Sequence, residues 1–225
     1  MLAFLDCDST LSSIEGVDEL AGLRGGDVQR EVAELTDRAM DGSISIGEVF
    51  ARRLELILPS LEECRAIGQR YIETIEPTAA DSVRRLQAAG WEIIILSGGH
   101  TQVIEPLAEH LGISRIEAVR LDFCGEGQYL DFDREYPSTR NGGKPDVIAS
   151  VKHQLGVPDG PSVMVGDGIS DLEVQERGEV DLFIGFGAFV TREPVRAGAE
   201  VWATSLREAT DHILGRFPGP VGGTT

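Results

Sequence analysis

The chain opens with LAFLDCDST, residues 2–10, in which a short apolar run ends abruptly at two aspartates. An apolar run of this length is typical of a buried strand, and Asp6 and Asp8 would then lie in the loop that follows it. Cys7 lies between them, and the alternation of side chains along an extended backbone predicts that its thiol is buried as a packing residue. We therefore expect the first strand to end in a pair of acidic side chains.

Residues 15–75 have the periodicity of helices. Apolar residues recur there at steps of three or four, which predicts amphipathic helices that bury one face. The two apolar stripes are Val28, Val32, Leu35 and Ala39, and then Ile46, Phe50, Leu54 and Ile57, with Pro59 ending the second.

Beyond Pro77, short apolar runs alternate with helical segments, which is the pattern of a parallel sheet with crossover helices. We predict an α/β fold with a doubly wound (Rossmann-like) parallel sheet core in residues 1–14 and 76–225. A small helical cap domain, residues 15–75, would be inserted after the first strand. It would cover the carboxyl ends of the strands, where open α/β sheets bind ligands. The alternative is a helical subdomain that only enlarges the core.

Four further strands are expected within the core, together with a hairpin that interrupts the alternation and lies outside the main sheet. The Gly- and Pro-rich tail from Phe217 is predicted to be disordered. The expected strands are residues 91–96, 163–165, 182–184 and 201–203, and the expected hairpin spans residues 119–132.

Composition excludes several classes of partner. The 225 residues include 20 basic and 38 acidic side chains, a formal net charge of -18. Such a surface repels nucleic acid and anionic membranes, so we expect neither as a partner. The three cysteines predict reduced thiols and no disulfide framework. No signal peptide or membrane span is apparent at the start of the sequence, which favours the cytoplasm. The oligomeric state stays open between monomer and dimer.

Polar or glycine-rich segments follow three of the expected strands. They are DCDST at residues 6–10, SGGH at 97–100 and GDGISD at 166–171. Because the carboxyl ends of parallel strands meet at one edge of a sheet, these segments should converge there. A fourth segment, NGGKP at residues 141–145, places Lys144 directly before an expected helix whose first turn suits Pro145.

Carboxylates of Asp6, Asp8 and Asp167 gathered at that edge would repel one another by about 4 kcal/mol per close pair. A divalent cation must relieve this repulsion. Oxygen ligands beside a phosphate favour Mg²⁺ over Ca²⁺, because no twelve-residue calcium loop is present.

With the charge of a phosphate shielded in this way, one carboxylate could attack phosphorus while a second donates a proton to the leaving alkoxide. Ser97 and the amides of Gly98 and Gly99 could hold phosphate oxygens at a helix N-terminus, and Lys144 would add a fixed positive charge. The residues thus favour phosphate ester chemistry.

The four segments, in this order, resemble the four motifs of the haloacid dehalogenase superfamily of phosphatases. Within it, the sequence is similar to the phosphoserine phosphatase family over nearly the whole chain to about Leu214. The segments that carry the closer resemblance are DCDST at 6–10, EGVDELA at 15–21, SGG at 97–99, GGK at 142–144 and FIGFG at 183–187.

This resemblance implies an aspartyl-phosphate intermediate on Asp6, with Asp8 as the general acid and base. It implies that Mg²⁺ binds the Asp6 and Asp167 carboxylates and the backbone carbonyl of Asp8. Phosphate would be held by Ser97, Gly98, Gly99 and Lys144, while Asp171 would orient Lys144 or a metal-bound water from outside this set of ligands.

The substrate that the resemblance implies is a small phosphomonoester, best matched by O-phosphoserine. Such a ligand needs an anion for its ammonium and a fork-shaped cation for its carboxylate. Glu15 and Arg53 match the substrate-binding positions of the family, and Met40 matches a residue that lines the same pocket. Ser170, also assigned to this pocket, is a mild departure at a position where the family has a small polar residue. Each of the four could instead be an ordinary surface or core residue.

Two other functions remain open at this stage. One keeps the mechanism but acts on another small phosphorylated metabolite, or transfers phosphate to an alcohol. The other is a non-catalytic module that binds Mg²⁺ or phosphate. Surface positions are the default expectation for all four histidines, His100, His110, His153 and His212. Of these, His100 also departs from the phenylalanine more common in the family.

Overall fold

The computed structural model describes residues 1–40 and 44–218, excluding the side chains of Asp37, Ala39, Met40 and Ile46. Within this part, no helix is both long enough and apolar enough to cross a membrane. The predicted disorder of the tail falls, from residue 219 on, outside the described residues. Phe217 itself is only half exposed, and its ring lies 5.8 Å from that of Trp91.

A six-stranded sheet forms the centre of the molecule, in the order β3-β2-β1-β6-β7-β8, and every neighbouring pair is parallel. Starting from β1, the chain adds β2 and β3 on one side and then β6, β7 and β8 on the other, which confirms the doubly wound sheet. The strands are β1 (Leu2–Leu5), β2 (Glu92–His100), β3 (Arg115–Val119), β6 (Ser162–Gly166), β7 (Leu182–Phe186) and β8 (Val201–Ala203).

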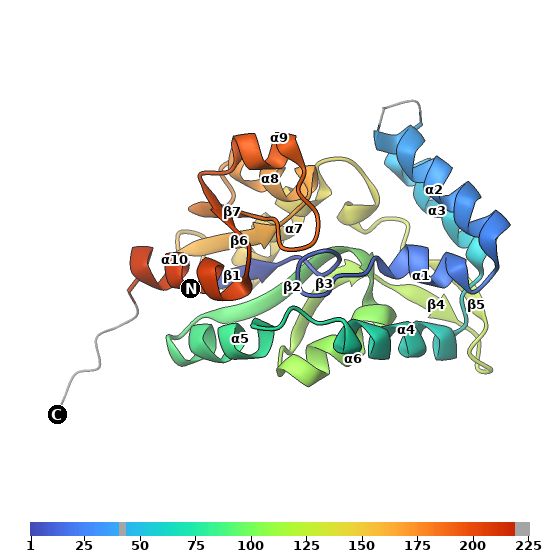
Figure 1. Ribbon diagram of the computed structural model, residues 1–225, viewed down its shortest axis with the longest axis horizontal. Coiled ribbons are helices and arrows are strands. Elements are labelled where there is room, and N and C mark those ends of the chain that lie inside the picture. The colour runs from blue at the N-terminus through green and yellow to red at the C-terminus, as the bar shows by residue number, and fades with distance from the viewer. Residues whose placement is uncertain (41–43, 219–225) are drawn as a thin grey trace.

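The two faces of β1 enter two separate apolar clusters, because successive side chains of a strand point in opposite directions. Ala3 and Leu5 pack with helices α5 (Ala79–Ala88), α6 (Thr101–Leu111) and α10 (Leu206–Arg216). Leu2 and Phe4 pack with α7 (Gly143–Gln154), α8 (Ile169–Glu176) and α9 (Glu193–Gly198). Helices therefore cover both faces of the sheet, as Figure 1 shows.

Two strands differ from the sequence prediction. β3 was not expected, because charged Arg115 and Glu117 interrupt the apolar run of this edge strand. β2 continues past Leu96 to His100, with a register shift against β3 over this stretch. The SGGH segment is therefore the end of a strand, and α6 begins directly after it at Thr101.

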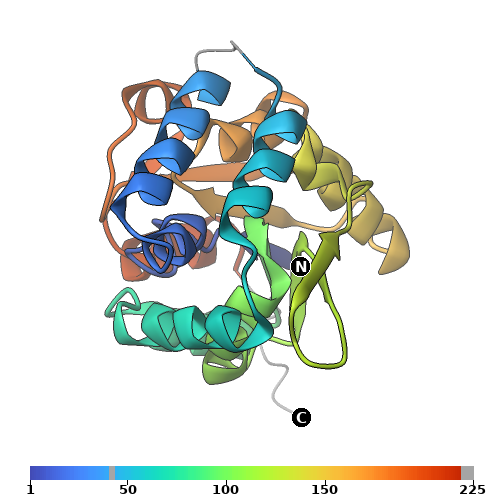
Figure 2. The same cartoon turned by 90° about the vertical axis from the view of Figure 1, so that its right-hand side faces the viewer.

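Four helices are inserted between β1 and α5. They are α1 (Gly16–Gly22), α2 (Gly26–Met40), α3 (Ile46–Ile57) and α4 (Leu61–Glu73). In Figures 1 and 2, α2 and α3 stand side by side above the end of the sheet that carries the loops. Helix α4 instead packs along α6, where Gly68 approaches Pro106 so closely that a Cβ would overlap it. The cap boundary at residue 75 stays a prediction, and α4 is shared with the core.

The predicted hairpin is confirmed outside the main sheet. Strands β4 (Leu121–Phe123) and β5 (Tyr129–Phe132) pair antiparallel, and the 3-10 helix η1 (Pro137–Thr139) follows them. The ring of Phe132 lies 5.2 Å from that of Phe50 on α3. The hairpin therefore packs against the inserted helices from the side of the core.

Helix α7 begins at Gly143, two residues earlier than the sequence suggested, so Lys144 lies within its first turn. Gly142 adopts a left-handed conformation at the N-cap, with φ 70°. Gly143 is so close to η1 that a Cβ would overlap the carbonyl of Pro137. These two glycines fix the point at which the helix carrying Lys144 starts.

We predict that Gly143→Ala lowers the free energy of unfolding by about 2 kcal/mol, because backbone overlap at Pro137 outweighs the better helix propensity of alanine. Gly215→Ala on α10 is the matched control, since no atom lies within 4 Å of its new Cβ. Urea unfolding of both variants measures the difference. Equal stability of the two variants would contradict the close packing assigned to Gly143.

Candidate active site

Lys144 joins two carboxylates at the carboxyl edge of the sheet. Its Nζ donates to Oδ1 of Asp6, after β1, at 2.8 Å and to Oδ1 of Asp171, in α8, at 2.5 Å. All three residues are at most 6% exposed. Burial alone would lower the pKa of Lys144, but Asp171 and Asp6 outweigh burial and raise it, so the ammonium form is retained.

Asp167, at the end of β6, completes a buried acidic group. One carboxylate oxygen from each of Asp6, Asp167 and Asp171 lies within 4.8 Å of the other two. Burial, followed by the charge of Asp171, raises the pKa of Asp167 to about 6. Burial likewise raises the pKa of Asp6 well above its usual value, and Lys144 only partly offsets this. The group carries more negative charge than Lys144 neutralises.

The donor set fits a divalent cation. Carboxylate oxygens at this spacing are hard ligands, and burial together with their mutual repulsion raises the pKa values of Asp6 and Asp167, which a bound cation would oppose. The sequence had assigned Asp171 to an outer position, yet its carboxylate lies in the same group as those of Asp6 and Asp167. The side chain of Asp8 does not belong to this group within the described residues.

Arg192 supplies a second cation at this edge and was not predicted. Its Nε donates to Oδ2 of Asp167 at 3.0 Å from the loop that follows β7. The signal that could have indicated it is its place after a strand adjacent to β6. Because its side chain is 35% exposed, Arg192 can move aside at little cost when a metal ion reaches Asp167.

The carboxylate of Asp8 turns away from the acidic group and toward the inserted helices. Its Oδ1 accepts hydrogen bonds from the amide of Gly16, at 2.8 Å, and from the hydroxyl of Tyr71. Its Oδ2 faces the hydroxyl of Ser97 at 3.4 Å. Burial and the charge of Glu15 raise the pKa of Asp8 to about 6, although both Oδ1 donors oppose the shift. A carboxyl group with this pKa can exchange a proton near neutral pH.

The end of β2 lines the other side of this space. Ser97 is 1% exposed, and its Oγ accepts a hydrogen bond from the amide of Gly99 at 3.0 Å. A Cβ at Gly99 would lie 3.0 Å from Oδ2 of Asp8, whereas at Gly98 it would meet nothing within 4 Å. The tight approach at Gly99 keeps the strand end directly beside Asp8.

Two charged side chains of the inserted helices approach the same space. Glu15, directly before α1, accepts a hydrogen bond from Ser9 at 2.7 Å. Arg53 on α3 stacks over the ring of Phe50 with 5.6 Å between Cζ and the ring centre. Its buried Nε has no hydrogen-bond partner among the described residues. Burial lowers the pKa of Arg53, against the charges of Asp18, Glu15 and Asp8.

Of the two remaining predicted pocket residues, the structure describes the side chain of Ser170 and not that of Met40. Ser170 lies in the first turn of α8 and is exposed. Met40 ends α2, and its side chain lies outside the described residues. The described contacts do not bring Ser170 into the group around Asp6 and Lys144.

His100, the last residue of β2, is the one histidine that differs from the expectation of a surface position. It is 3% exposed, and its ring meets that of Phe50 edge-on at 5.3 Å. In the part of the chain that the structure describes, neither ring nitrogen has a hydrogen-bond partner. Burial and the nearby Arg53 lower its pKa to about 3. The imidazole is therefore neutral and bridges the sheet and α3. His110, His153 and His212 are exposed, as expected.

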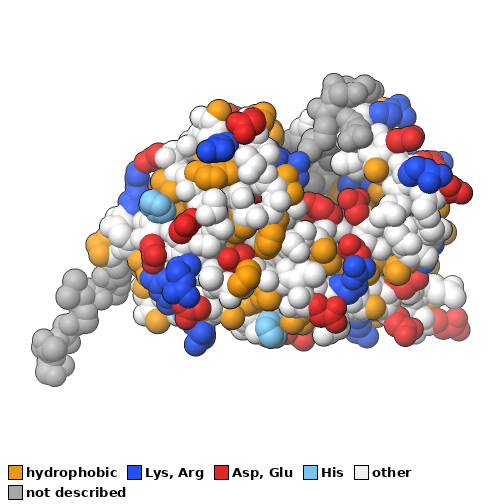
Figure 3. Space-filling model, in the orientation of Figure 1, with side chains coloured by type: hydrophobic (Ala, Val, Ile, Leu, Met, Phe, Trp, Pro, Cys, Tyr) orange, Lys and Arg blue, Asp and Glu red, His pale blue; other side chains and the backbone are white. Residues whose placement is uncertain are grey.

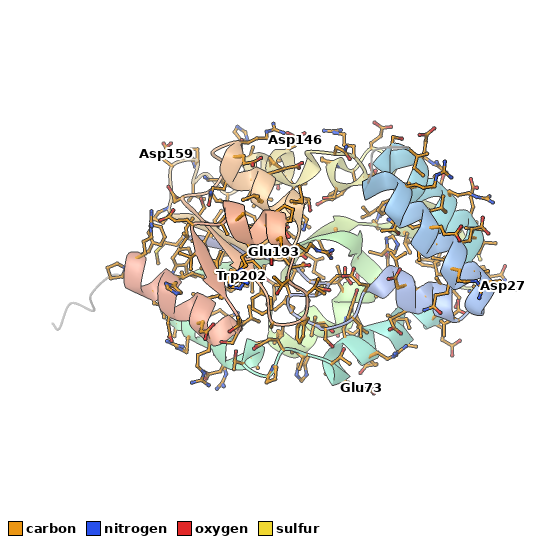
Figure 4. The ribbon with its side chains drawn as sticks, turned by 45° about the horizontal axis from the view of Figure 1, so that its top comes forward. Asp27, Glu73, Asp146, Asp159, Glu193 and Trp202 are labelled. Atoms are coloured by element: carbon orange, nitrogen blue, oxygen red, sulfur yellow. The ribbon has the colours of Figure 1, made fainter. Side chains whose placement is uncertain are left out.

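Charged side chains near the site form ion pairs both in its buried interior and on the surface beside it. In Figure 3 the face seen in Figure 1 is hollowed between α2 and α3 on one side and α7 to α9 on the other, and acidic side chains gather there. Asp146 lies on the outer side of α7 (Figure 4), paired with Arg140 at 2.8 Å and Arg177 at 3.0 Å. Its surface ion pairs contrast with the buried ones of Lys144, two residues earlier.

The comparison with protein families identifies the class of protein. Residues 3–176 match the family model for haloacid dehalogenase-like hydrolases. The chain belongs to this hydrolase family, which also confirms the resemblance found in its sequence.

Within this family, the chain is similar to individual proteins named phosphoserine phosphatase. Phosphoserine phosphatase of Bos taurus is 36% identical over 205 residues, which cover 90% of this chain and 88% of the bovine protein. The chloroplastic phosphoserine phosphatase of Arabidopsis thaliana is 38% identical over 197 residues, covering 87% of this chain and 65% of that protein.

Among solved structures, the fold is similar to one described as a phospho-aspartyl intermediate analogue of phosphoserine phosphatase. The TM-score is 0.77 at 25% identity, over 94% of this chain and 97% of the other. The α/β fold with its inserted helices is thus one that phosphoserine phosphatases share.

The buried neutral imidazole of His100 predicts a pH dependence of stability. Its pKa is about 3 when folded and near 6.5 when unfolded, so below pH 6.5 the unfolded chain binds the extra proton and folding is weakened. Between pH 7 and pH 5 this residue should remove about 2 kcal/mol from the free energy of unfolding.

His100→Phe should lack this component, and urea unfolding at the two pH values measures it. His110→Gln, an exposed change on the adjoining helix α6, is the control and should keep the full pH dependence. If His100→Phe lost as much stability on acidification as the unmodified protein, the buried neutral imidazole would be wrong.

Proposed function

We propose that this protein is a Mg²⁺-dependent phosphatase that hydrolyses O-phosphoserine to serine and phosphate through an aspartyl-phosphate intermediate on Asp6. The observation that carries the proposal is the bridge from Lys144 to Asp6 and Asp171, with the carboxylate of Asp167 beside them. The match to the hydrolase family and to proteins named phosphoserine phosphatase supports the same reaction.

In the first step, a carboxylate oxygen of Asp6 attacks phosphorus as the bond from phosphorus to the serine oxygen breaks. The leaving alkoxide takes a proton from Asp8, whose pKa of about 6 suits this transfer. Lys144 holds Asp6 in place and offsets the negative charge of nucleophile and phosphate. Ser97 and the amides of Gly98 and Gly99 hold the phosphate oxygens at the end of β2.

In the second step, water attacks the phosphoryl group on Asp6 while Asp8, now ionised, accepts its proton. The bond between phosphorus and Asp6 breaks, which returns the carboxylate and releases inorganic phosphate. Mg²⁺, held by Asp6, Asp167 and the backbone carbonyl of Asp8, with Asp171 close by, would shield the charge of the phosphate. Arg192 would then leave Asp167 to the metal.

Substrate choice falls to the inserted helices. Arg53 offers a guanidinium whose Nε bonds to no other described side chain or backbone group, suited to the carboxylate of an amino acid. Glu15 offers a carboxylate for the ammonium group, and Met40 and Ser170 would line the same pocket. The predicted location stays the cytoplasm, and the oligomeric state stays open between monomer and dimer.

Arg53→Ala should reduce kcat/KM for O-phosphoserine by about 10- to 100-fold, the size of a lost charge-assisted hydrogen bond. With p-nitrophenyl phosphate, which has no carboxylate, the change should stay within about twofold. Arg52→Ala is the matched control, because Arg52 is exposed and pairs with Glu31 at 3.2 Å. Equal losses on both substrates would instead favour a phosphatase for other small metabolites.

Catalysis itself is tested by Asp6→Asn, which should abolish phosphate release from every substrate. In the unmodified protein, mass spectrometry after acid quench should find a phosphoryl group on the peptide that contains Asp6. Binding of Mg²⁺ with no phosphate release from any substrate would favour the non-catalytic module. Transfer of the phosphoryl group from Asp6 to an added alcohol instead of water would favour a phosphotransferase.

A further inference from the structure

The most unusual contact of the site joins Asp8 to a helix far away in the sequence. Tyr71 lies on α4 and is 1% exposed, and its hydroxyl donates to Oδ1 of Asp8. Nothing in the motif segments indicates it, because a tyrosine on the apolar stripe of a helix is typical of a core residue. Its hydroxyl is nevertheless directed at the proposed general acid.

Gly16 makes room for this contact. Its amide donates to the same Oδ1 atom at 2.8 Å. A Cβ at this position would overlap the hydroxyl of Tyr71, so only glycine allows amide and hydroxyl to reach one oxygen together. Both donors come from the segment inserted after β1, which therefore holds Asp8 from the side opposite to the phosphate.

The two oxygens of Asp8 are thus placed in different surroundings. Oδ1 receives two donated hydrogen bonds, which occupy its lone pairs and leave no place for a proton. Oδ2 faces the hydroxyl of Ser97 and the backbone at Gly99, where the phosphate would bind. A proton on Asp8 therefore belongs on Oδ2, the oxygen nearest to the leaving group.

We propose that Tyr71 is a positioning residue that, together with the amide of Gly16, makes Oδ2 of Asp8 the oxygen that carries and delivers the catalytic proton. The inference rests on the proposed phosphatase function. In the first step the bond from Oδ2 to hydrogen breaks, the proton passes to the alkoxide, and Oδ1 keeps both of its donors. Tyr71 neither gains nor loses a proton.

The dependence of rate on the leaving group tests this role. Proton donation matters for an alkyl leaving group such as that of O-phosphoserine and matters little for p-nitrophenolate, which leaves without a proton. Tyr71→Phe removes one hydroxyl and keeps the buried ring. It should lower kcat/KM for O-phosphoserine about tenfold, a part of the roughly 10²- to 10⁴-fold that general acids supply, and that for p-nitrophenyl phosphate by less than about threefold.

Tyr136→Phe is the matched control. Its hydroxyl also donates to a carboxylate, Oε2 of Glu117 at 2.8 Å, away from the site. This variant should leave the ratio of the two kcat/KM values unchanged. If the role of Tyr71 were purely structural, Tyr71→Phe would lower kcat/KM equally for the two substrates. That result, or an unchanged kcat/KM for both substrates, would overturn the proposal.

A second readout does not depend on turnover. In a crystal structure of Tyr71→Phe, the Asp8 carboxylate should turn away from its present orientation, because Oδ1 retains only the amide of Gly16. An unmoved carboxylate would overturn the positioning role. Failure of the substrate assignment is distinguishable, since it would appear in the unmodified protein as an absence of O-phosphoserine hydrolysis.

Discussion

The arrangement of the site depends on the burial of three carboxylates against one ammonium group. Asp6, Asp167 and Asp171 come from the ends of two adjacent strands and the helix after the second, and Lys144 from the start of α7. Isolated charges in such surroundings are costly, and one partner does not neutralise three. The fold tolerates this because packing on both faces of the sheet holds the strands in register, and the remaining charge creates the demand for a metal ion.

The inserted helices supply those contacts of the site that the sheet does not. The sheet positions Asp6 and Asp167, but the carboxylate of Asp8 is held by Gly16 and Tyr71 from the insertion. Arg53 and Phe50 come from the same inserted layer, and the ring of Phe50 meets that of His100 on the sheet edge-on. A movement of these helices would therefore change the surroundings of the proposed acid and of the substrate pocket together, which is consistent with a reaction that must exclude water and later admit it.

The sequence predicted those features of the fold and site that depend on residues close together in the chain, and it missed those that depend on residues far apart. β1 and its acidic end are readable, because four apolar residues and two aspartates are adjacent in the chain. β3 was missed, since an edge strand with Arg115 and Glu117 has no continuous apolar run. The contact of Tyr71 with Asp8 spans 63 positions, and the burial of His100 depends on Phe50 of another helix. Such contacts exist only after the helices have packed, so no local pattern encodes them.

The most direct test of the central claim is the thermal midpoint of unfolding of the unmodified protein and of Asp167→Asn, each with and without Mg²⁺ at pH 7.5. At this pH the Asp167 carboxyl, with a pKa of about 6, is ionised against the cost of burial. Without metal, the variant should therefore melt higher than the unmodified protein. Added Mg²⁺ should raise the midpoint of the unmodified protein and leave the variant nearly unchanged. A metal-free variant that melts lower, together with no response of the unmodified protein to Mg²⁺, would contradict the account.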